Sequence, residues 1–132
     1  MKIPASLTRY VKDGLAQDVI AQLEQALGFE LPSDFRSFLL VSDGMSIGGG
    51  TLVYGSNDLV ERNETLEVGD YTPGYVAIGD SGEGSVFLMK LESTDPAVYA
   101  VDTGVMDVNF MIPVGCSIED WMRHGCPIRQ TN

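Results

Sequence analysis

The pattern of apolar residues changes near Gly44, and this change decides the fold class. Before Gly44, Ile20, Leu23 and Leu27 recur at intervals of three and four residues, which predicts a helix over 18–27. After it, short segments rich in Val, Ile, Tyr and Phe alternate with turn residues, which is typical of hairpin-connected strands. Helices, then strands, then a last helix predict an α+β fold with a mainly antiparallel central sheet.

A hairpin of two helices is expected at the N-terminal end. Gly28 stands where the first helix needs a left-handed C-cap, and Pro32 suits the opening of the second helix. Phe35 and Phe38 fall on one face of that second helix, so we expect both side chains to be buried. The turn residues at 42–44 end the helix.

The later elements follow from β propensity, turn residues and capping residues. We expect strands at 51–54, 75–78, 85–91 and 98–102, a weaker strand at 108–112, and a flexible loop at 48–50. A third helix is expected from a cap at Asn57 to about Glu67, and a terminal helix over 118–124 after Ser117. The helical hairpin and the terminal helix then flank the sheet in a single domain over 1–132.

One tetrapeptide has the form of a catalytic motif. Gly79-Asp80-Ser81-Gly82 matches the nucleophile sequence of chymotrypsin-like serine proteases, whose serine needs a histidine base within hydrogen-bond reach. The one histidine, His124, lies at the end of the terminal helix, where a cation has a structural reason to be. We interpret the tetrapeptide as a hairpin turn and predict no catalytic residues.

Ligand-binding motifs are also missing from the sequence. Residues 44–50 are glycine-rich but lack the lysine of a P-loop, and residues 80–83 lack the pattern of a calcium loop. Cys116 and Cys126 have no zinc spacing, and the ends of the helix between them lie roughly 11 Å apart, beyond disulfide geometry. We therefore expect two free thiols, no metal and no cofactor.

The net charge of the chain is the sequence feature that most clearly indicates the kind of partner. The chain has a net charge of −11, and 43–120 holds fourteen Asp and Glu residues against Arg62 and Lys90 alone. Such a field repels nucleic acid and anionic lipid and attracts basic proteins. The sequence has no apolar run of the roughly 18 residues that a membrane span needs, and no signal-peptide pattern at its start. We expect a cytoplasmic protein with a protein partner, and neither nucleic acid nor a membrane.

The candidate contact residues are the acidic side chains on and after the third helix and in the loop that follows the next strand. They are Asp58, Glu61, Glu64, Glu67, Asp70, Asp80 and Glu83. A solvated helix face explains the same pattern about equally well. If the partner does not use the acidic side chains, an apolar surface near Tyr71 and Tyr75 is the next candidate.

The order of several motifs resembles the SUKH superfamily. These are the helix 18–27, Leu31-Pro32-Ser33-Asp34-Phe35-Arg36-Ser37-Phe38-Leu39, Ser42-Asp43-Gly44, Leu52-Val53-Tyr54-Gly55, Asn63, and Ile78-Gly79-Asp80-Ser81-Gly82-Glu83-Gly84. The resemblance spans about residues 18–124, with Ser85 where the family often has Asp. It implies an α+β fold with a central sheet flanked by helices, and it supplies no catalytic residues to carry over.

The resemblance also implies a function. Bacterial members are mostly immunity proteins, so we expect a non-enzymatic domain that binds and neutralises a basic polymorphic toxin, such as a nuclease. One alternative is a regulatory scaffold, as in the fungal members that regulate cell-wall assembly. A weaker alternative is a carboxylate-dependent hydrolase, because spacing alone does not exclude paired catalytic carboxylates. The identity of the toxin and the oligomeric state stay open.

Overall fold

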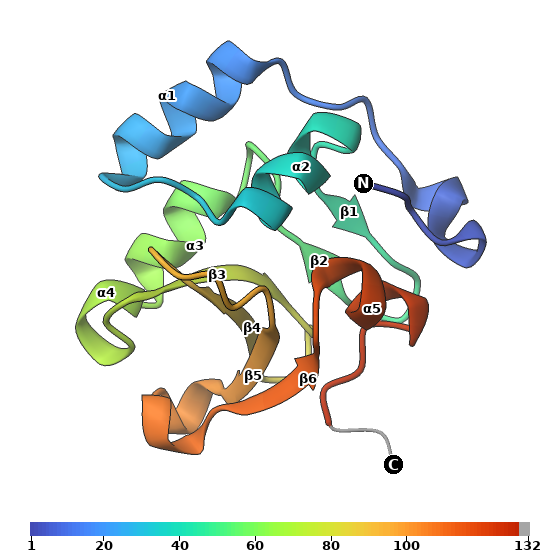
Figure 1. Ribbon diagram of the computed structural model, residues 1–132. Coiled ribbons are helices and arrows are strands. Elements are labelled where there is room, and N and C mark those ends of the chain that lie inside the picture. Colours follow the sequence, from blue (N-terminus) through green and yellow to red (C-terminus); the bar gives the residue numbers. More distant parts are fainter. Residues whose placement is uncertain (130–132) are drawn as a thin grey trace.

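A computed structural model describes residues 1–129 and shows one antiparallel sheet with helices packed around it (Figure 1). The strands follow one another in chain order: β1 (Met45–Ser46), β2 (Leu52–Val53), β3 (Tyr75–Asp80), β4 (Ser85–Lys90), β5 (Val98–Asp102) and β6 (Ile112–Gly115). The predicted α+β class with an antiparallel sheet is confirmed.

Helices precede, interrupt and follow this sheet. They are η1 (Ala5–Tyr10), α1 (Gln17–Leu27), α2 (Ser33–Val41), α3 (Leu59–Thr65), α4 (Val68–Tyr71), η2 (Thr103–Val105), η3 (Val108–Phe110) and α5 (Ile118–Arg123). In Figure 1, α1 and α2 lie above the sheet and α5 packs against α2. The insertion of α3 and α4 between β2 and β3 places both helices beside the start of β3.

Aromatic side chains join the helices to the sheet. Phe35 and Phe38 of α2 are fully buried, as predicted, with stacked rings 5.9 Å apart. Trp121 of α5 packs on Phe87 of β4 at 4.6 Å between ring centroids. Because these rings belong to one continuous cluster, α2, α5 and the sheet share a core.

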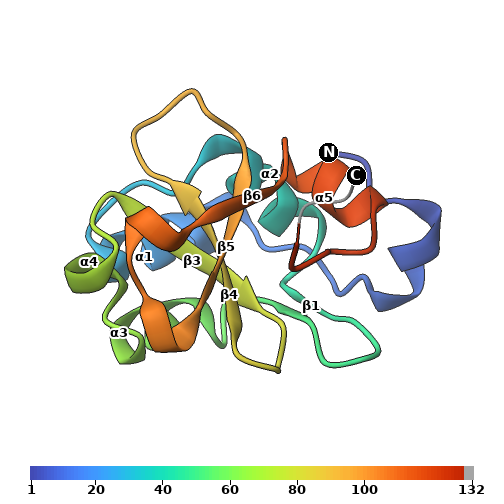
Figure 2. The same cartoon turned by 90° about the horizontal axis from the view of Figure 1, so that it is seen from below.

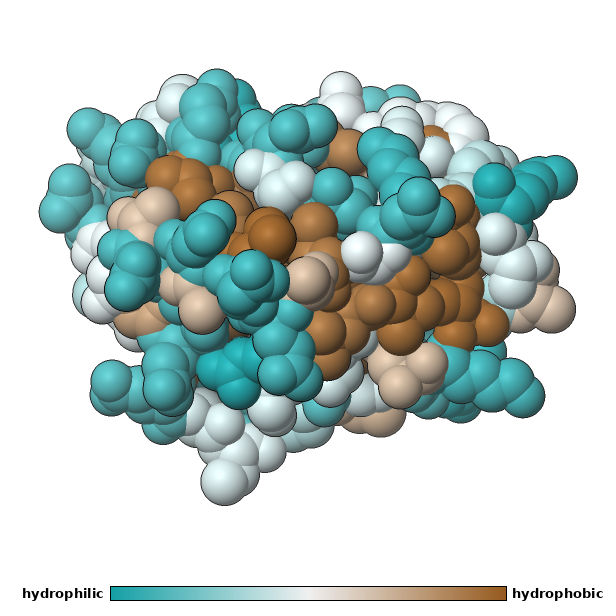
Figure 3. All heavy atoms as spheres, turned by 90° about the horizontal axis from the view of Figure 1, so that it is seen from above, coloured by the Kyte–Doolittle hydropathy of each residue, from teal (hydrophilic) through white to brown (hydrophobic). Residues whose placement is uncertain are grey.

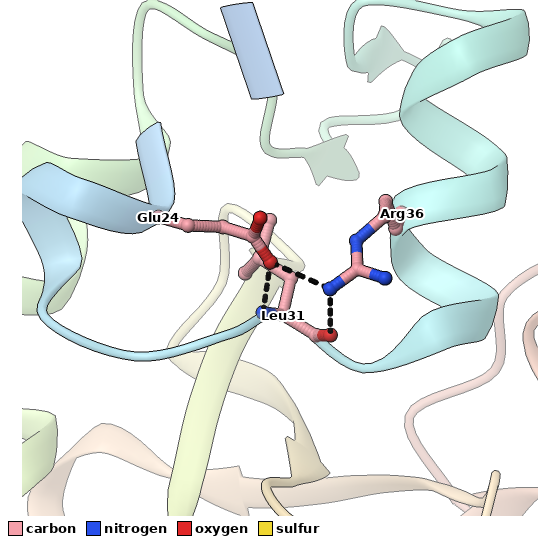
Figure 4. A network of polar contacts seen from close by, with 3 residues as sticks. All are labelled: Glu24, Leu31 and Arg36. Atoms are coloured by element: carbon pink, nitrogen blue, oxygen red, sulfur yellow. Dashed lines mark hydrogen bonds and ion pairs between the residues drawn. The ribbon is translucent and has the colours of Figure 1, made fainter. Parts of the chain in front are cut away.

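A carboxylate holds the corner between α1 and α2 (Figure 4). Glu24 Oε2 accepts hydrogen bonds from Leu31 N at 2.7 Å and from Arg36 Nη2 at 2.8 Å, and Arg36 also donates to the Leu31 carbonyl at 3.4 Å. Gly28 adopts the expected left-handed cap with φ 88°, and Pro32 lies one residue before α2 begins. The predicted helical hairpin is confirmed.

The third helix differs from its prediction. Asn57 does not cap it: α3 begins after Asp58, and no side chain makes a cap bond there. The helix also breaks, because Glu67 is left-handed with φ 52° and a separate helix, α4, follows. Nine helical residues turn the chain by about 900°, so an unbroken helix would point Val68 away from the side of the buried Leu59. The break instead buries Val68.

The segment between β5 and α5 also differs. The strand expected at 108–112 is wrong: η3 occupies Val108–Phe110, and β6 begins at Ile112. Asp107 Oδ1 accepts a hydrogen bond from Asn109 N at 2.8 Å, which fixes a turn where β propensity alone favoured a strand. The glycine loop at 48–50 connects a short hairpin of β1 and β2. The N-cap of the last helix is as predicted, since Ser117 Oγ accepts from Asp120 N.

Candidate interaction surface

Four of the predicted contact residues lie exposed along α3 and α4. Glu61 and Glu64 are on α3, Glu67 is at the break between the helices, and Asp70 is on α4. The opposite side of α3 buries Leu59 and Asn63. The helix therefore separates a buried side from an acidic exposed side, as the sequence pattern indicated.

Asn63 fixes α3 to the sheet. Its Nδ2 donates to the carbonyl oxygens of Leu59 and Ala77, and its Oδ1 accepts from Ala77 N, each at 2.9 Å. The β2–β3 register pairs Leu52 with Asp80 and Val53 with Gly79. Ala77 thus lies before the stretch of β3 that pairs with β2. On this edge of β3, the Asn63 amide of α3 makes hydrogen bonds with both the backbone N and the carbonyl oxygen of Ala77.

The Asp80 carboxylate accepts two hydrogen bonds within the fold. The Tyr54 hydroxyl donates to Asp80 Oδ2 at 2.7 Å, and Gly82 N donates to Asp80 Oδ1 at 3.0 Å. Burial first, and then the Asp80 carboxylate, raise the pKa of Tyr54 above its usual range, while the charge of Arg62 opposes this shift. Tyr54, Asp80 and Arg62 line one cavity of about 210 Å³. The Arg62 guanidinium also pairs with the Glu61 carboxylate at 3.6 Å.

The two remaining predicted contact residues are Asp58 and Glu83, which lie outside α3 and α4. Asp58 is half-buried directly before α3, and Glu83 is exposed in the turn between β3 and β4. Because Asp80 and Arg62 line one cavity, the β3–β4 turn and α3 are neighbours. The contact role of these seven residues stays a prediction.

The ribbon of α3 and α4 lies near the segment that forms η2 and η3 (Figure 1, Figure 2). A groove lies between these two segments. This α4 groove has a volume of about 560 Å³ and is lined by Thr65, Leu66, Glu67, Tyr71, Thr103, Gly104, Val105, Met106, Asp107 and Phe110. Tyr71, Val105 and Phe110 are exposed. Tyr71 was predicted for the alternative surface, but Phe110 was not, because a strand was expected at 108–112. The spacing Asp-x-Gly at 102–104 and Asp-x-Asn at 107–109 could have indicated turns.

The other aromatic side chain of the alternative surface points elsewhere. Tyr75 is half-buried, and its ring is perpendicular to the Tyr99 ring, with 5.9 Å between centroids. It lines a separate cavity of about 320 Å³, together with Phe29 and Leu91. Tyr75 is not among the residues that line the α4 groove, to which Tyr71 belongs.

The side that carries α1 and α2 also has apolar exposure. Figure 3 shows a band of hydrophobic residues there, among hydrophilic ones. Val11 and Leu40 are the exposed large hydrophobic residues between positions 10 and 43, at 38% and 40%. Backbone bonds such as Leu15 N to the Leu39 carbonyl hold the N-terminal segment against α2 on this side.

The protease-like tetrapeptide lies at the β3–β4 hairpin: Gly79 and Asp80 end β3, and Ser81 and Gly82 begin the turn. Ser81 is buried, and its Oγ accepts hydrogen bonds from Glu83 N at 3.1 Å and Ser85 N at 3.2 Å. His124 Nδ1 lies 2.8 Å from the Asp120 carbonyl oxygen and 3.4 Å from its Oδ1. The serine oxygen and the imidazole therefore serve separate local structures.

Both cysteines are free, as predicted. Cys126 is buried, and burial raises the pKa of its thiol to about 12. Cys116 is exposed, and the neighbouring Asp120 carboxylate raises the pKa of this thiol above its usual value. Within residues 1–129, no three His, Cys, Asp or Glu side chains converge as a metal site would require. In the same part of the chain, no helix has the length and apolar character to cross a membrane.

Comparisons with known proteins agree with this fold. The model of the SMI1 / KNR4 family (SUKH-1) matches residues 14–124. The chain is also similar to the uncharacterized protein YnaB of Bacillus subtilis (strain 168). The two are 31% identical over 117 residues, an alignment that covers 80% of this chain and 77% of YnaB.

Proposed function

Because the chain belongs to the SMI1/KNR4 family (SUKH-1), we propose that it is a non-enzymatic immunity protein that binds and neutralises a basic toxin domain. Proteins of this family generally act by binding other proteins, as immunity or regulatory proteins. The neutralising role and the basic partner go beyond family membership and rest on the charge of the exposed surface.

The observation that carries the proposal is the acidic side of α3 and α4. Glu61, Glu64, Glu67 and Asp70 are exposed together, and Arg62 is the one basic residue in this stretch of chain. A toxin that acts on nucleic acid presents positive charge to phosphate groups. Carboxylates grouped on one side compete for that charge, and they raise the rate at which the two proteins meet.

Gene neighbourhood and rescue separate this function from a regulatory scaffold. An immunity gene lies beside the gene of its toxin, and its product protects a cell that produces the toxin. The first test is therefore co-expression of the chain with the toxin domain encoded by the adjacent gene. Cell survival and co-purification of the two proteins are expected, and neither would result from a scaffold role.

The second test addresses the acidic surface itself. The double variant Glu64→Lys/Glu67→Lys leaves Glu61 paired with Arg62 and changes the surface charge by four units. We expect association with that toxin domain to slow by roughly tenfold at low salt, and by much less at 0.5 M salt, because added salt screens exposed charges. The variant Asp13→Lys/Asp18→Lys makes the same charge change at exposed positions in and before α1. An equal effect of both double variants would contradict a role for α3 and α4.

A further inference from the structure

Exposed apolar side chains concentrate at the α4 groove. Nine large hydrophobic residues are exposed in residues 1–129, and five of them are Tyr71, Val105, Val108, Phe110 and Ile112, at the groove or on the segment that forms one wall. Phe110 is 61% exposed and Tyr71 is 55% exposed. Exposed apolar residues that cluster in this way are typical of interaction sites, and aromatic residues often carry their binding energy.

The backbone holds these side chains in place. Asp102 Oδ1 accepts a hydrogen bond from Gly104 N at 2.7 Å, and Asp107 Oδ1 accepts from Asn109 N at 2.8 Å. Phe110 N also donates to the Asp107 carbonyl at 3.0 Å. Since the turns on both sides of Val105 are fixed before any partner arrives, binding loses less conformational entropy than it would on an unstructured loop.

The groove is acidic as well as apolar. Glu67 and Asp107 line it, and its lining contains no Lys, Arg or His. The basic residue that lines the adjoining cavity is Arg62, which is paired with Glu61 and shares that cavity with Asp80. The charge therefore favours a positively charged occupant over a negative or neutral one.

Resting on the proposed function, we infer that the α4 groove receives a basic segment of the partner protein, with one large apolar side chain of that segment inserted as an anchor. The groove volume of about 560 Å³ lies within the range of known ligand pockets and suffices for such a side chain. Tyr71 and Phe110 contact the anchor, while Glu67 and Asp107 face the flanking basic groups. Apolar contact then controls dissociation, and the surrounding carboxylates control association.

Defined peptides test this inference without the natural partner. The full chain, labelled with ¹⁵N, is titrated with the peptide Gly-Lys-Lys-Trp-Lys-Lys-Gly, with the same peptide carrying Gly in place of Trp, and with the same peptide carrying Glu in place of each Lys. We expect the first to shift amide resonances of 65–71 and 103–110, the second to bind at least fivefold more weakly, and the third not to bind. Phe110→Ala should weaken the first peptide at least fivefold, whereas the matched control Leu40→Ala, at an exposed apolar position on α2, should not.

Two results would overturn the inference. One is equal affinity for the Trp and Gly peptides, and the other is a set of shifted resonances that leaves out 103–110. Measuring toxin association for Phe110→Ala and Tyr71→Ala separates this inference from the proposed function. If toxin is neutralised with unchanged dissociation rates in both variants, the immunity proposal stands and the groove is excluded. If no toxin is neutralised but the peptide binds as described, the groove stands and the immunity proposal fails.

Discussion

Replacing Asn63 by alanine tests the hydrogen bonds that hold α3 against the sheet. The wild-type side chain makes three bonds of 2.9 Å, and it is 8% exposed. Each such bond contributes about 1 kcal/mol net, and a buried donor left without a partner costs about 1–3 kcal/mol. Since Asn63→Ala removes the bonds to both backbone groups of Ala77, we expect a loss of roughly 3–4 kcal/mol in unfolding free energy. This is a large part of the roughly 5–15 kcal/mol of a small domain.

Urea unfolding measures this loss, with the fluorescence of the fully buried Trp121 as the signal. Asn57→Ala is the matched control, because Asn57 is exposed and makes no cap bond, so its loss should stay below about 0.5 kcal/mol. Asn63→Asp adds a pH test: a buried carboxyl group facing two carbonyl oxygens has a raised pKa in the folded state. This variant should therefore lose stability as pH rises above about 4. A loss below 1 kcal/mol for Asn63→Ala would refute the reasoning.

Two further predictions concern polar groups outside the groove. The pKa of Tyr54 is raised in the folded state by burial and by Asp80. The contribution of the Tyr54 hydroxyl to stability is therefore complete below about pH 10 and is lost at higher pH. In urea unfolding from pH 9 to 11, the unfolding free energy should fall more steeply for wild type than for Tyr54→Phe. Ser81→Ala and His124→Ala should leave toxin neutralisation intact in the survival assay, and loss of protection by both folded variants would restore a catalytic interpretation.

Local signals in the sequence were sufficient for the elements with clear caps or periodicity. Gly28 and Ser117 mark the end of α1 and the start of α5, and both act as the sequence predicts. The strand Val98–Asp102 agrees with its prediction at both ends. The two-residue strands β1 and β2 are too short for a periodic pattern, and the prediction missed β1 entirely. Strand β1 pairs with β2, and β2 pairs with β3, which lies more than twenty residues further along the chain, so a local pattern does not contain this pairing.

The candidate surface was predictable only in part. Helix phase correctly placed Glu61 and Glu64 on the exposed side of α3, because α3 is regular there. The break at Glu67 was missed because it serves the burial of Val68 in a tertiary contact. The bond between Tyr54 and Asp80 depends on the register of β2 and β3, which the sequence does not state.

The two sides of α3 allow binding and stability to be changed separately. The buried side holds the helix through Leu59 and Asn63, where a substitution costs several kcal/mol. The exposed side carries Glu61 and Glu64, where a substitution typically changes stability by no more than about 0.5 kcal/mol. The surface can therefore be adapted to a different partner while the fold is retained. It follows that a variant that binds poorly but unfolds at the wild-type urea concentration has lost a contact on the exposed side, and not the position of the helix.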